Sequence, residues 1–292
     1  MTGPVTSVAM VIVSFNTRED LAGCLSSLAA DPPATPHEIV VVDNASTDGS
    51  ADLVSATWPE TLIIRNQTNV GFARATNQGI RATTSDLVLL LNSDTVVPSG
   101  SVDGLCAALL ADPQAAAVGP RLVDGNGLAE LSFGRMVGPW NELRQKALGW
   151  LSVEGPTWAR NRLQAWTRVP RDADWVSGAC LLVRRRSAED AGLLDERFFM
   201  YGEDVDFCAT LRANGGRILF VPAVQVVHLR GRSSRAAPAA TTAAYRRSQI
   251  AFYEKHHPAW APVLRGFLRL RGKHPDDQRS GFRGQGSAGD RR

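Results

Sequence analysis

Short apolar runs alternate with helical patterns along the first third of the chain. Runs of strand length predict β-strands at residues 8–14, 38–42, 61–65 and 87–91. Between them, apolar side chains recur at helical spacing, which predicts helices at about residues 18–30, 50–56 and 72–83. A strand that is apolar on both faces belongs in a sheet covered on both sides, and strand–helix alternation favours parallel pairing. We therefore expect an α/β fold with a mostly parallel sheet flanked by helices.

The pattern continues with less regularity after Pro98. It predicts helices at about 101–111, 140–151 and 204–213, and strands at 117–122, 174–183, 217–221 and 224–228. We divide the chain into a domain over 1–233, with a nucleotide-binding half at about 1–98 and an acceptor half at about 99–233. A helical extension over 234–271 and a disordered basic tail over 272–292 follow.

Polar side chains stand where the predicted strands end. The strand at 87–91 leads into Asn92-Ser93-Asp94, and the earlier strands lead into Asn16, Asp43 and the Asn69–Gly71 turn. Open α/β sheets bind ligands at the carboxyl ends of their strands. Each of these residues alone is also typical of a turn or a helix cap, and Asn16 or Thr17 could cap the helix at 18–30. Four such strand ends in succession form a rim suited to a nucleotide, although neither GxGxxG nor GxxxxGK[ST] is present.

Acidic residues and a histidine supply candidate chemistry. Asp94 offers a hard oxygen ligand of the kind preferred by Mg²⁺ or Mn²⁺, and His228 offers a nitrogen ligand. Glu203, Asp204 and Asp206 place three carboxylates within four positions, where mutual repulsion can raise one pKa. The simpler alternatives are an acidic first turn that complements the helix dipole and a strand-end histidine without a metal.

Tryptophan and arginine are concentrated between residues 132 and 171, where four of the seven tryptophans occur. In the predicted helix at 140–151, the apolar residues share one face. That face predicts either a cover helix packed on the sheet or an amphipathic helix that faces the acceptor or touches a membrane.

Composition narrows the remaining possibilities. The net charge of +3 is too small to indicate nucleic acid as a partner, but residues 265–292 hold eight basic and three acidic side chains, a net of +5. The four cysteines form no CxxC motif and are expected to be buried free thiols. We see no secretory signal and no run long enough to span a membrane. We expect a cytoplasmic protein, with the basic tail attaching it loosely to the inner face of the membrane.

Several of these motifs, in this order, resemble the family 2 glycosyltransferases, and most closely their bacterial rhamnosyltransferase branch. The resemblance runs from residue 8 to about 233 and rests on Ser14-Phe-Asn16, Val42-Asp43-Asn44 with Ser46 and Asp48-Gly49, Asn69-Val-Gly71-Phe72 with Asn77-Gln-Gly79, Asn92-Ser93-Asp94, Gly202-Glu203-Asp204-Val-Asp206 and Val227-His228. It implies a GT-A fold, a nucleotide-diphosphate sugar donor, a divalent metal (Mg²⁺ or Mn²⁺) and inversion at the anomeric carbon.

The resemblance also implies roles for individual residues. Asp204 would be the catalytic base, with Glu203 and Asp206 beside it. Asp94 and His228 would bind the metal, although Asn92 stands where the family's motif has an aspartate. The donor would be bound by Ser14, Asn16, Asp43, Asn44, Asn69, Gly71, Phe72, Asn77, Asn92 and Ser93.

The expected reaction moves a sugar, rhamnose from dTDP-rhamnose, to a hydroxyl of a cell-envelope glycan or a polyprenyl-linked acceptor. Two other classes remain open. A nucleotidyltransferase would carry a glycine-rich basic loop after the first strand, which residues 14–18 do not form. A non-catalytic sugar-nucleotide-binding protein would have little use for both Asp94 and Asp204.

Overall fold

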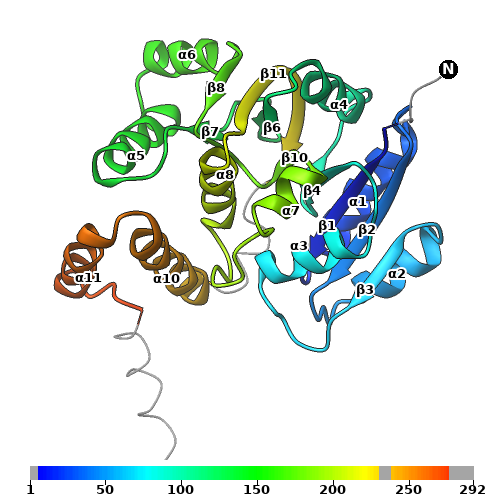
Figure 1. Cartoon of the computed structure of the whole chain (residues 1–292), viewed down its shortest axis with the longest axis horizontal. Helices are drawn as coiled ribbons and strands as arrows, with labels where there is room; N and C mark the ends of the chain where they lie inside the picture. Colours follow the sequence, from blue (N-terminus) through cyan, green and yellow to red (C-terminus); the bar gives the residue numbers. More distant parts are fainter. Residues whose placement is uncertain (1–5, 230–237, 276–292) are drawn as a thin grey trace, which may run out of the picture.

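The computed structural model describes residues 6–229 and 238–275, and a single large sheet organises the first of these segments (Figure 1). Within the described residues this sheet has nine strands, in the order β3-β2-β1-β4-β10-β6-β11-β5, with β8 paired to β11. Its strands are β1 (Val8–Ser14), β2 (His37–Asp43), β3 (Leu62–Arg65), β4 (Leu87–Asn92), β5 (Thr95–Val96), β6 (Ala115–Val123), β8 (Arg171–Ala173), β10 (Cys180–Arg184) and β11 (Arg217–His228). A separate small ribbon pairs β7 (Phe133–Gly134) with β9 (Trp175–Val176).

Helices follow most of these strands. They are α1 (Arg18–Ala30), α2 (Ser50–Thr57), α3 (Phe72–Arg81), α4 (Ser101–Ala111), α5 (Pro139–Val153), α6 (Thr157–Trp166), α7 (Arg185–Asp190) and α8 (Glu203–Ala213). The second described segment contains α10 (Pro238–His256), the short 3₁₀ helix η1 (Pro258–Trp260) and α11 (Ala261–Leu270). Helix α10 lies next to α8 and α11 lies beyond α10, on the opposite side of the molecule from β1, β2 and β3 (Figure 1).

Parallel pairing brings the polar strand ends together. β1 pairs in parallel with β2 and β4, so Ser14 lies opposite Asp43 and Val13 lies opposite Asn92. β10 enters antiparallel between β4 and β6, while β6 and β11 are parallel to each other. The expected α/β fold with a mostly parallel sheet is thus confirmed.

The two apolar faces of the sheet explain the unbroken hydrophobic runs. Alternate residues of β1 and β4 enter different cores, with Met10 and Leu89 on one face and Val11 and Val88 on the other. Helices α1 and α4 cover the first face, and α3, α7 and α8 cover the second. All four cysteines are buried and free, as expected.

Two strand predictions differ from the structure. The strand expected at 174–183 is broken into β9 and β10, because residues 177–179 leave the sheet. The two strands expected at 217–221 and 224–228 form one strand, β11, with a register shift between Val221 and Gln225. A local irregularity of this kind re-aims the side chains that follow it, which here include His228.

The helix expected at 140–151 forms as α5, but the cover-helix interpretation is wrong. Trp140, Leu143 and Trp150 are 77%, 61% and 59% exposed, so its apolar face does not pack on the sheet. No helix in the described ranges combines the length and apolar character needed to span a membrane. The tail prediction falls mostly on residues 276–292, which lie outside the described residues.

Candidate functional site

Hydroxyl groups join the ends of β1 and β4. The Thr17 hydroxyl lies 3.0 Å from the Ser14 hydroxyl and 2.9 Å from the Ser93 hydroxyl. Thr17 is the N-cap residue of α1, as one form of the cap prediction has it, but its side chain makes no cap hydrogen bond. Its hydroxyl instead ties the two strand ends together.

Asp43, at the end of β2, has one carboxylate oxygen that is hydrogen-bonded and one that has no donor among the described residues. Its Oδ2 accepts a hydrogen bond from the Ser46 amide at 3.2 Å. Its Oδ1 is buried and finds no donor within the described part of the chain. Asn16 has a positive φ of 53° and supports the same loop, because its Oδ1 accepts a hydrogen bond from the Thr47 amide at 2.8 Å. A buried acceptor without a donor is costly, which indicates a place for a ligand hydroxyl or N–H.

Asn44 holds the neighbouring loop through its amide side chain. Its Nδ2 donates to Asn69 Oδ1 at 2.9 Å, and its Oδ1 accepts from the Val70 amide at 3.0 Å. The Phe72 amide in turn donates to the Phe199 carbonyl at 2.7 Å. Gly71 has φ +89°, and a Cβ there would lie 2.7 Å from the same carbonyl oxygen, so only glycine fits this approach.

Asn77 lies on α3, and its side chain is hydrogen-bonded to the backbone of Leu194. Its Nδ2 donates to the Leu194 carbonyl at 2.9 Å, and its Oδ1 accepts from the Leu194 amide at 3.0 Å. The structure therefore places Asn44, Asn69 and Asn77 as supports of the loops around the site, while Asp43 presents the open oxygen.

Asp94 and His228 are brought together by the pairing of β5 with β11. His228 lies opposite Thr95 in that pairing, and the Leu229 amide donates to the Asp94 carbonyl at 2.8 Å. The His228 Nε2 is 3.3 Å from Asp94 Oδ1, and its Nδ1 is 3.1 Å from Glu130 Oε2. Burial lowers the pKa of His228, but the hydrogen bonds and charges of Asp94 and Glu130 outweigh burial and raise this pKa to about 9.

Glu130 is a site residue that the sequence did not reveal. It follows a turn at residues 124–127, where the Gly127 amide donates to the Asp124 carbonyl at 2.9 Å, and no motif marks it. The only signal available was an acid shortly after a hairpin turn. Its contact with His228 Nδ1 leaves Nε2 directed at Asp94, which is the usual way a carboxylate orients a ligating histidine.

Glu203 and Asp204 begin α8 with one buried and one half-buried carboxyl group. The Gly178 amide donates to Asp204 Oδ2 at 2.9 Å, and the Val205 amide donates to Asp204 Oδ1 at 2.8 Å. Glu203 Oε2 is buried without a hydrogen-bond partner in the described ranges. Burial, then the charge of Asp204, raises the pKa of Glu203 to about 8. Burial also raises the pKa of Asp204, but its amide donors act against that shift. The amide donors favour the negative charge on Asp204 and the proton on Glu203.

The segment between β9 and β10 connects the two acidic groups. The Ala179 carbonyl accepts a hydrogen bond from the Asn92 amide at 3.0 Å, while the neighbouring Gly178 amide binds Asp204. Burial raises the pKa of Tyr201 most, and the charges of Glu203 and Asp94 raise it further. Both carboxyl groups therefore lie near the same phenol. The break in the strand thus places Asp204 next to Asn92, the last residue of β4. Asp94 follows Asn92 by two residues.

Asp206 is directed away from this cluster. Its side chain is 2% exposed, and its oxygens lie 2.8 Å from Lys255 Nζ and 2.7 Å from His256 Nε2, both on α10. Two basic partners already occupy its carboxylate. The structure therefore places Asp206 in the joint between α8 and α10, apart from Glu203 and Asp204.

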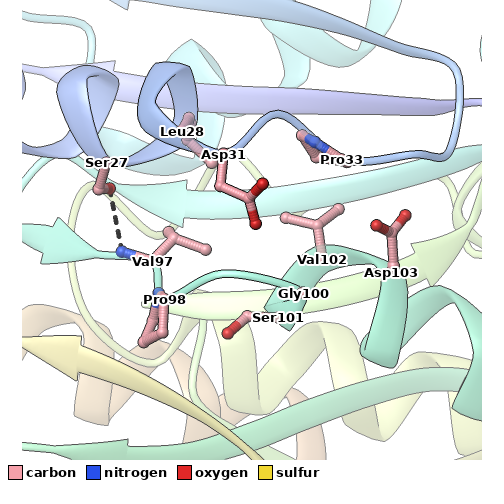
Figure 2. Close-up of a pocket in the computed structure, with 10 residues that line it drawn as sticks. All are labelled: Ser27, Leu28, Asp31, Pro33, Val97, Pro98, Gly100, Ser101, Val102 and Asp103. Atoms are coloured by element: carbon pink, nitrogen blue, oxygen red, sulfur yellow. Dashed lines mark hydrogen bonds between the residues drawn. The ribbon is translucent and has the colours of Figure 1, made fainter.

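A separate small cleft lies at the other end of α1 (Figure 2). Across it, the Val97 amide donates to the Ser27 hydroxyl at 3.0 Å. The carboxylate of Asp103, which also lines the cleft, accepts hydrogen bonds from the amides of Ala34 and Thr35. The cavity volume is about 10 Å³, which is room for a single water molecule. This cleft therefore serves packing rather than binding a sugar nucleotide.

Solved structures define the class to which this arrangement belongs. A mannosyltransferase from Pyrobaculum calidifontis in complex with GDP-Man and Mn²⁺ matches with a TM-score of 0.56 at 19% identity, covering 96% of this chain and 76% of that one. GalNAc-T7 with UDP, GalNAc and Mn²⁺ matches with a TM-score of 0.61 at 18% identity, covering 95% and 55%. The fold is the GT-A fold of glycosyltransferases.

Sequence comparison gives the family. Residues 9–189 match the model of glycosyl transferase family 2, and the chain belongs to that family. It is similar to the N-acetylglucosaminyl-diphospho-decaprenol L-rhamnosyltransferase of Mycobacterium tuberculosis, with 32% identity over 287 residues and 90% coverage of both chains. The resemblance to family 2 and to its rhamnosyltransferases is confirmed.

Proposed function

We propose that this protein is an inverting, metal-dependent glycosyltransferase that moves rhamnose from dTDP-rhamnose to a hydroxyl of a polyprenyl-linked acceptor in cell-envelope glycan synthesis. The mycobacterial relative supports both the sugar and the lipid-linked acceptor through its name. The observation that carries the proposal is the half-buried Asp204, fixed by two backbone amides beside the strand end that leads into Asp94. We further propose that the reaction takes place at the cytoplasmic face of the membrane.

The residues at the end of β4 fit a divalent cation in part. Asp94 supplies an oxygen and His228 a nitrogen within 3.3 Å of each other, a set compatible with Mg²⁺ or Mn²⁺ once the ring has released the proton that Asp94 and Glu130 favour. The described residues contain no cluster of three or more acidic, histidine or cysteine side chains arranged for a metal ion. Two protein ligands leave positions for phosphate oxygens, as is usual where a cation is bound together with a nucleotide. When bound, such an ion balances the charge that develops on the leaving diphosphate.

The other roles are assigned from the contacts of each residue. The open Oδ1 of Asp43 accepts a hydrogen bond from the base or ribose of the donor. The hydroxyls joining Ser14, Thr17 and Ser93 hold the strand ends that surround the nucleotide. We assign no direct donor contact to Asn44, Asn69 or Asn77, which shape the loops around it.

Asp204 acts as the base. The acceptor oxygen bonds to the anomeric carbon as the bond from that carbon to the diphosphate oxygen breaks, and the hydroxyl proton passes to Asp204. Glu203 keeps its own proton because burial raises its pKa, so it does not compete for this one. A single displacement of this kind inverts the anomeric carbon.

A paired measurement on Asp204→Asn and Glu203→Gln tests the assignment. We expect Asp204→Asn to bind dTDP-rhamnose nearly as tightly as the parent but to transfer sugar about 10²–10⁴-fold more slowly in single turnover. Glu203→Gln, the control in the same pair, should slow transfer less. Near-parental transfer by Asp204→Asn would exclude it as the base. Binding of UDP-GlcNAc or GDP-mannose in preference to dTDP-rhamnose would exclude the proposed donor, and donor binding without transfer would support a non-catalytic binding protein.

A further inference from the structure

The last helix of the described chain, α11, has one face against the protein and one face open. Towards the protein it turns the buried side chains of Ala261 and Leu268 and the partly buried side chain of Leu264, at positions i, i+7 and i+3. On a neighbouring face, also at helical spacing, the exposed side chains are Trp260 at the end of η1 and Val263, Phe267 and Leu270 of α11, which are 46%, 58%, 51% and 90% exposed. Packing against the protein therefore accounts for the buried face of α11 but not for its exposed apolar face.

Basic side chains flank the open face. Residues 261–275 include Arg265, Arg269, Arg271 and Lys273 but no aspartate or glutamate. The Arg271 guanidinium lies 5.1 Å from the centre of the Phe267 ring, beside the apolar strip. Arg265 forms an ion pair with Glu254, so the other three cations supply most of the charge available to a partner. An apolar strip with basic flanks is complementary to a lipid leaflet that carries anionic headgroups.

The start of α5 extends this surface. The His257 ring nitrogen Nε2 lies 2.8 Å from the Val137 carbonyl oxygen, so the residue before η1 contacts the segment just before α5. Trp140, the second residue of α5, is 77% exposed, and Trp260 closes η1. Figure 1 shows α5 and α11 on the same side of the molecule, away from β1, β2 and β3. Exposed tryptophans of this kind are typical of side chains at a membrane interface.

We propose that α11, with the start of α5, lies on the surface of an anionic lipid leaflet and holds the transferase beside its acceptor. The lipid contact follows from the surface itself, whereas its use in presenting a lipid-linked acceptor rests on the proposed function. A second copy of the chain is a poorer occupant, because a self-complementary contact would bring the same basic flanks together. The surface is also connected to the catalytic helix, since Lys255 and His256 at the end of α10 bind Asp206 of α8.

Vesicle flotation of the purified full chain tests the contact without using activity. We expect binding to vesicles that contain about one third anionic lipid, weaker binding to zwitterionic vesicles, and loss of binding at high salt. Phe267→Gln with Leu270→Gln should lower the partition coefficient about tenfold or more, because two exposed apolar side chains no longer enter the lipid. The matched control is Leu62→Gln with Leu110→Gln, which replaces two leucines of 47% and 44% exposure far from α11 and should leave binding unchanged.

Each outcome bears on a distinct statement. Thermal unfolding of both double variants should match the parent within a few degrees, because all four side chains are exposed. Equal vesicle binding by the parent and Phe267→Gln/Leu270→Gln overturns the lipid contact, and so does a stable dimer that the same variant dissociates. Transfer of sugar to a water-soluble acceptor should be unaffected in this variant. A variant that keeps this transfer but fails on vesicles supports the inference, whereas a parent that binds vesicles but transfers no sugar refutes only the proposed function.

Discussion

Replacing Asp206 by asparagine should destabilise the protein without removing its chemistry. The carboxylate is 2% exposed and lies 2.8 Å from Lys255 Nζ and 2.7 Å from His256 Nε2. Removing its charge leaves both basic side chains facing a neutral amide that can accept only through one oxygen. The joint between α8 and α10 should therefore weaken.

The expected loss can be estimated from these contacts. A hydrogen bond to a charged group contributes about 1.5–3 kcal/mol, so two such bonds bound the loss at about 3–6 kcal/mol. The Lys255 and His256 side chains are 27% and 23% exposed, and Lys255 keeps Asp195 at 2.9 Å. Solvent and Asp195 thus recover part of the loss, and the asparagine oxygen recovers more. We expect the free energy of unfolding to fall by about 2–3 kcal/mol.

Urea unfolding at constant pH measures this change, because urea does not screen ion pairs as guanidinium does. Asp52→Asn is the control, since Asp52 pairs with Arg65 at 2.7 Å but is 80% exposed, and it should cost less than about 0.5 kcal/mol. The reasoning fails if Asp206→Asn is as stable as Asp52→Asn. It also fails if Asp206→Asn is folded, binds donor and transfers sugar about 10²–10⁴-fold more slowly, because that result would make Asp206 the base.

Three further predictions concern the ends of the strands. Asp43→Ala should weaken dTDP binding by about 1–3 kcal/mol in titration calorimetry, because the open carboxylate oxygen is lost; an unchanged affinity in a folded variant would remove Asp43 from the donor site. Asp94→Ala should abolish Mn²⁺-dependent donor binding and His228→Ala should weaken it, as followed by the paramagnetic resonance of bound Mn²⁺; full transfer in chelator would contradict both. Glu130→Gln should weaken Mn²⁺-dependent donor binding about 10–100-fold through the orientation of His228, and an unchanged Mn²⁺ signal would limit Glu130 to packing.

Local patterns were sufficient to predict most of the sheet and the polar edge of the site. The apolar runs that form β1 and β4 are buried on both faces, so the apolar sequence alone was enough to predict their burial. Parallel pairing then places Ser14, Asp43 and Asn92 on one edge without further detail. The association of Asp94 with His228 came from the resemblance to family 2, and the pairing of β5 with β11 brings the two side chains together.

The features that the sequence did not predict depend on pairing between distant segments. Glu130 meets His228 because its amide bonds to the Leu122 carbonyl of β6, and β6 pairs with β11 at one register that no local pattern encodes. Asp206 was grouped with Asp204 by proximity in sequence. Helical geometry turns residues two positions apart onto different faces, and Asp206 therefore meets α10 instead. The break in the strand at residues 177–179 likewise depends on a contact between distant segments, the hydrogen bond that the Gly178 amide donates to Asp204.

The start of α8 must meet two opposing conditions, because its carboxyl groups are costly to ionise but a base must be ionised. Glu203 is buried and the adjacent Asp204 is half-buried. Loss of hydration raises the pKa of both, which means that ionising either group weakens the folded state at neutral pH. A base for sugar transfer nevertheless has to be ionised and shielded from water. Amide donors from Gly178 and Val205 offset part of the cost at Asp204, but no described group does so for Glu203 Oε2.

The stabilisation of this helix start must therefore come from elsewhere in the chain, and the α10 joint is positioned to supply it. Asp206 lies within the first turn of α8 and is bound by two basic side chains of α10. Ser248, also on α10, donates to the Met200 carbonyl at 2.8 Å, just before the same turn. These contacts hold the helix start from the side opposite to Gly178. Bracing of this turn by α10 gives Asp206 a structural role, which explains why it occurs so close to Glu203 and Asp204 although it binds α10 instead of Gly178.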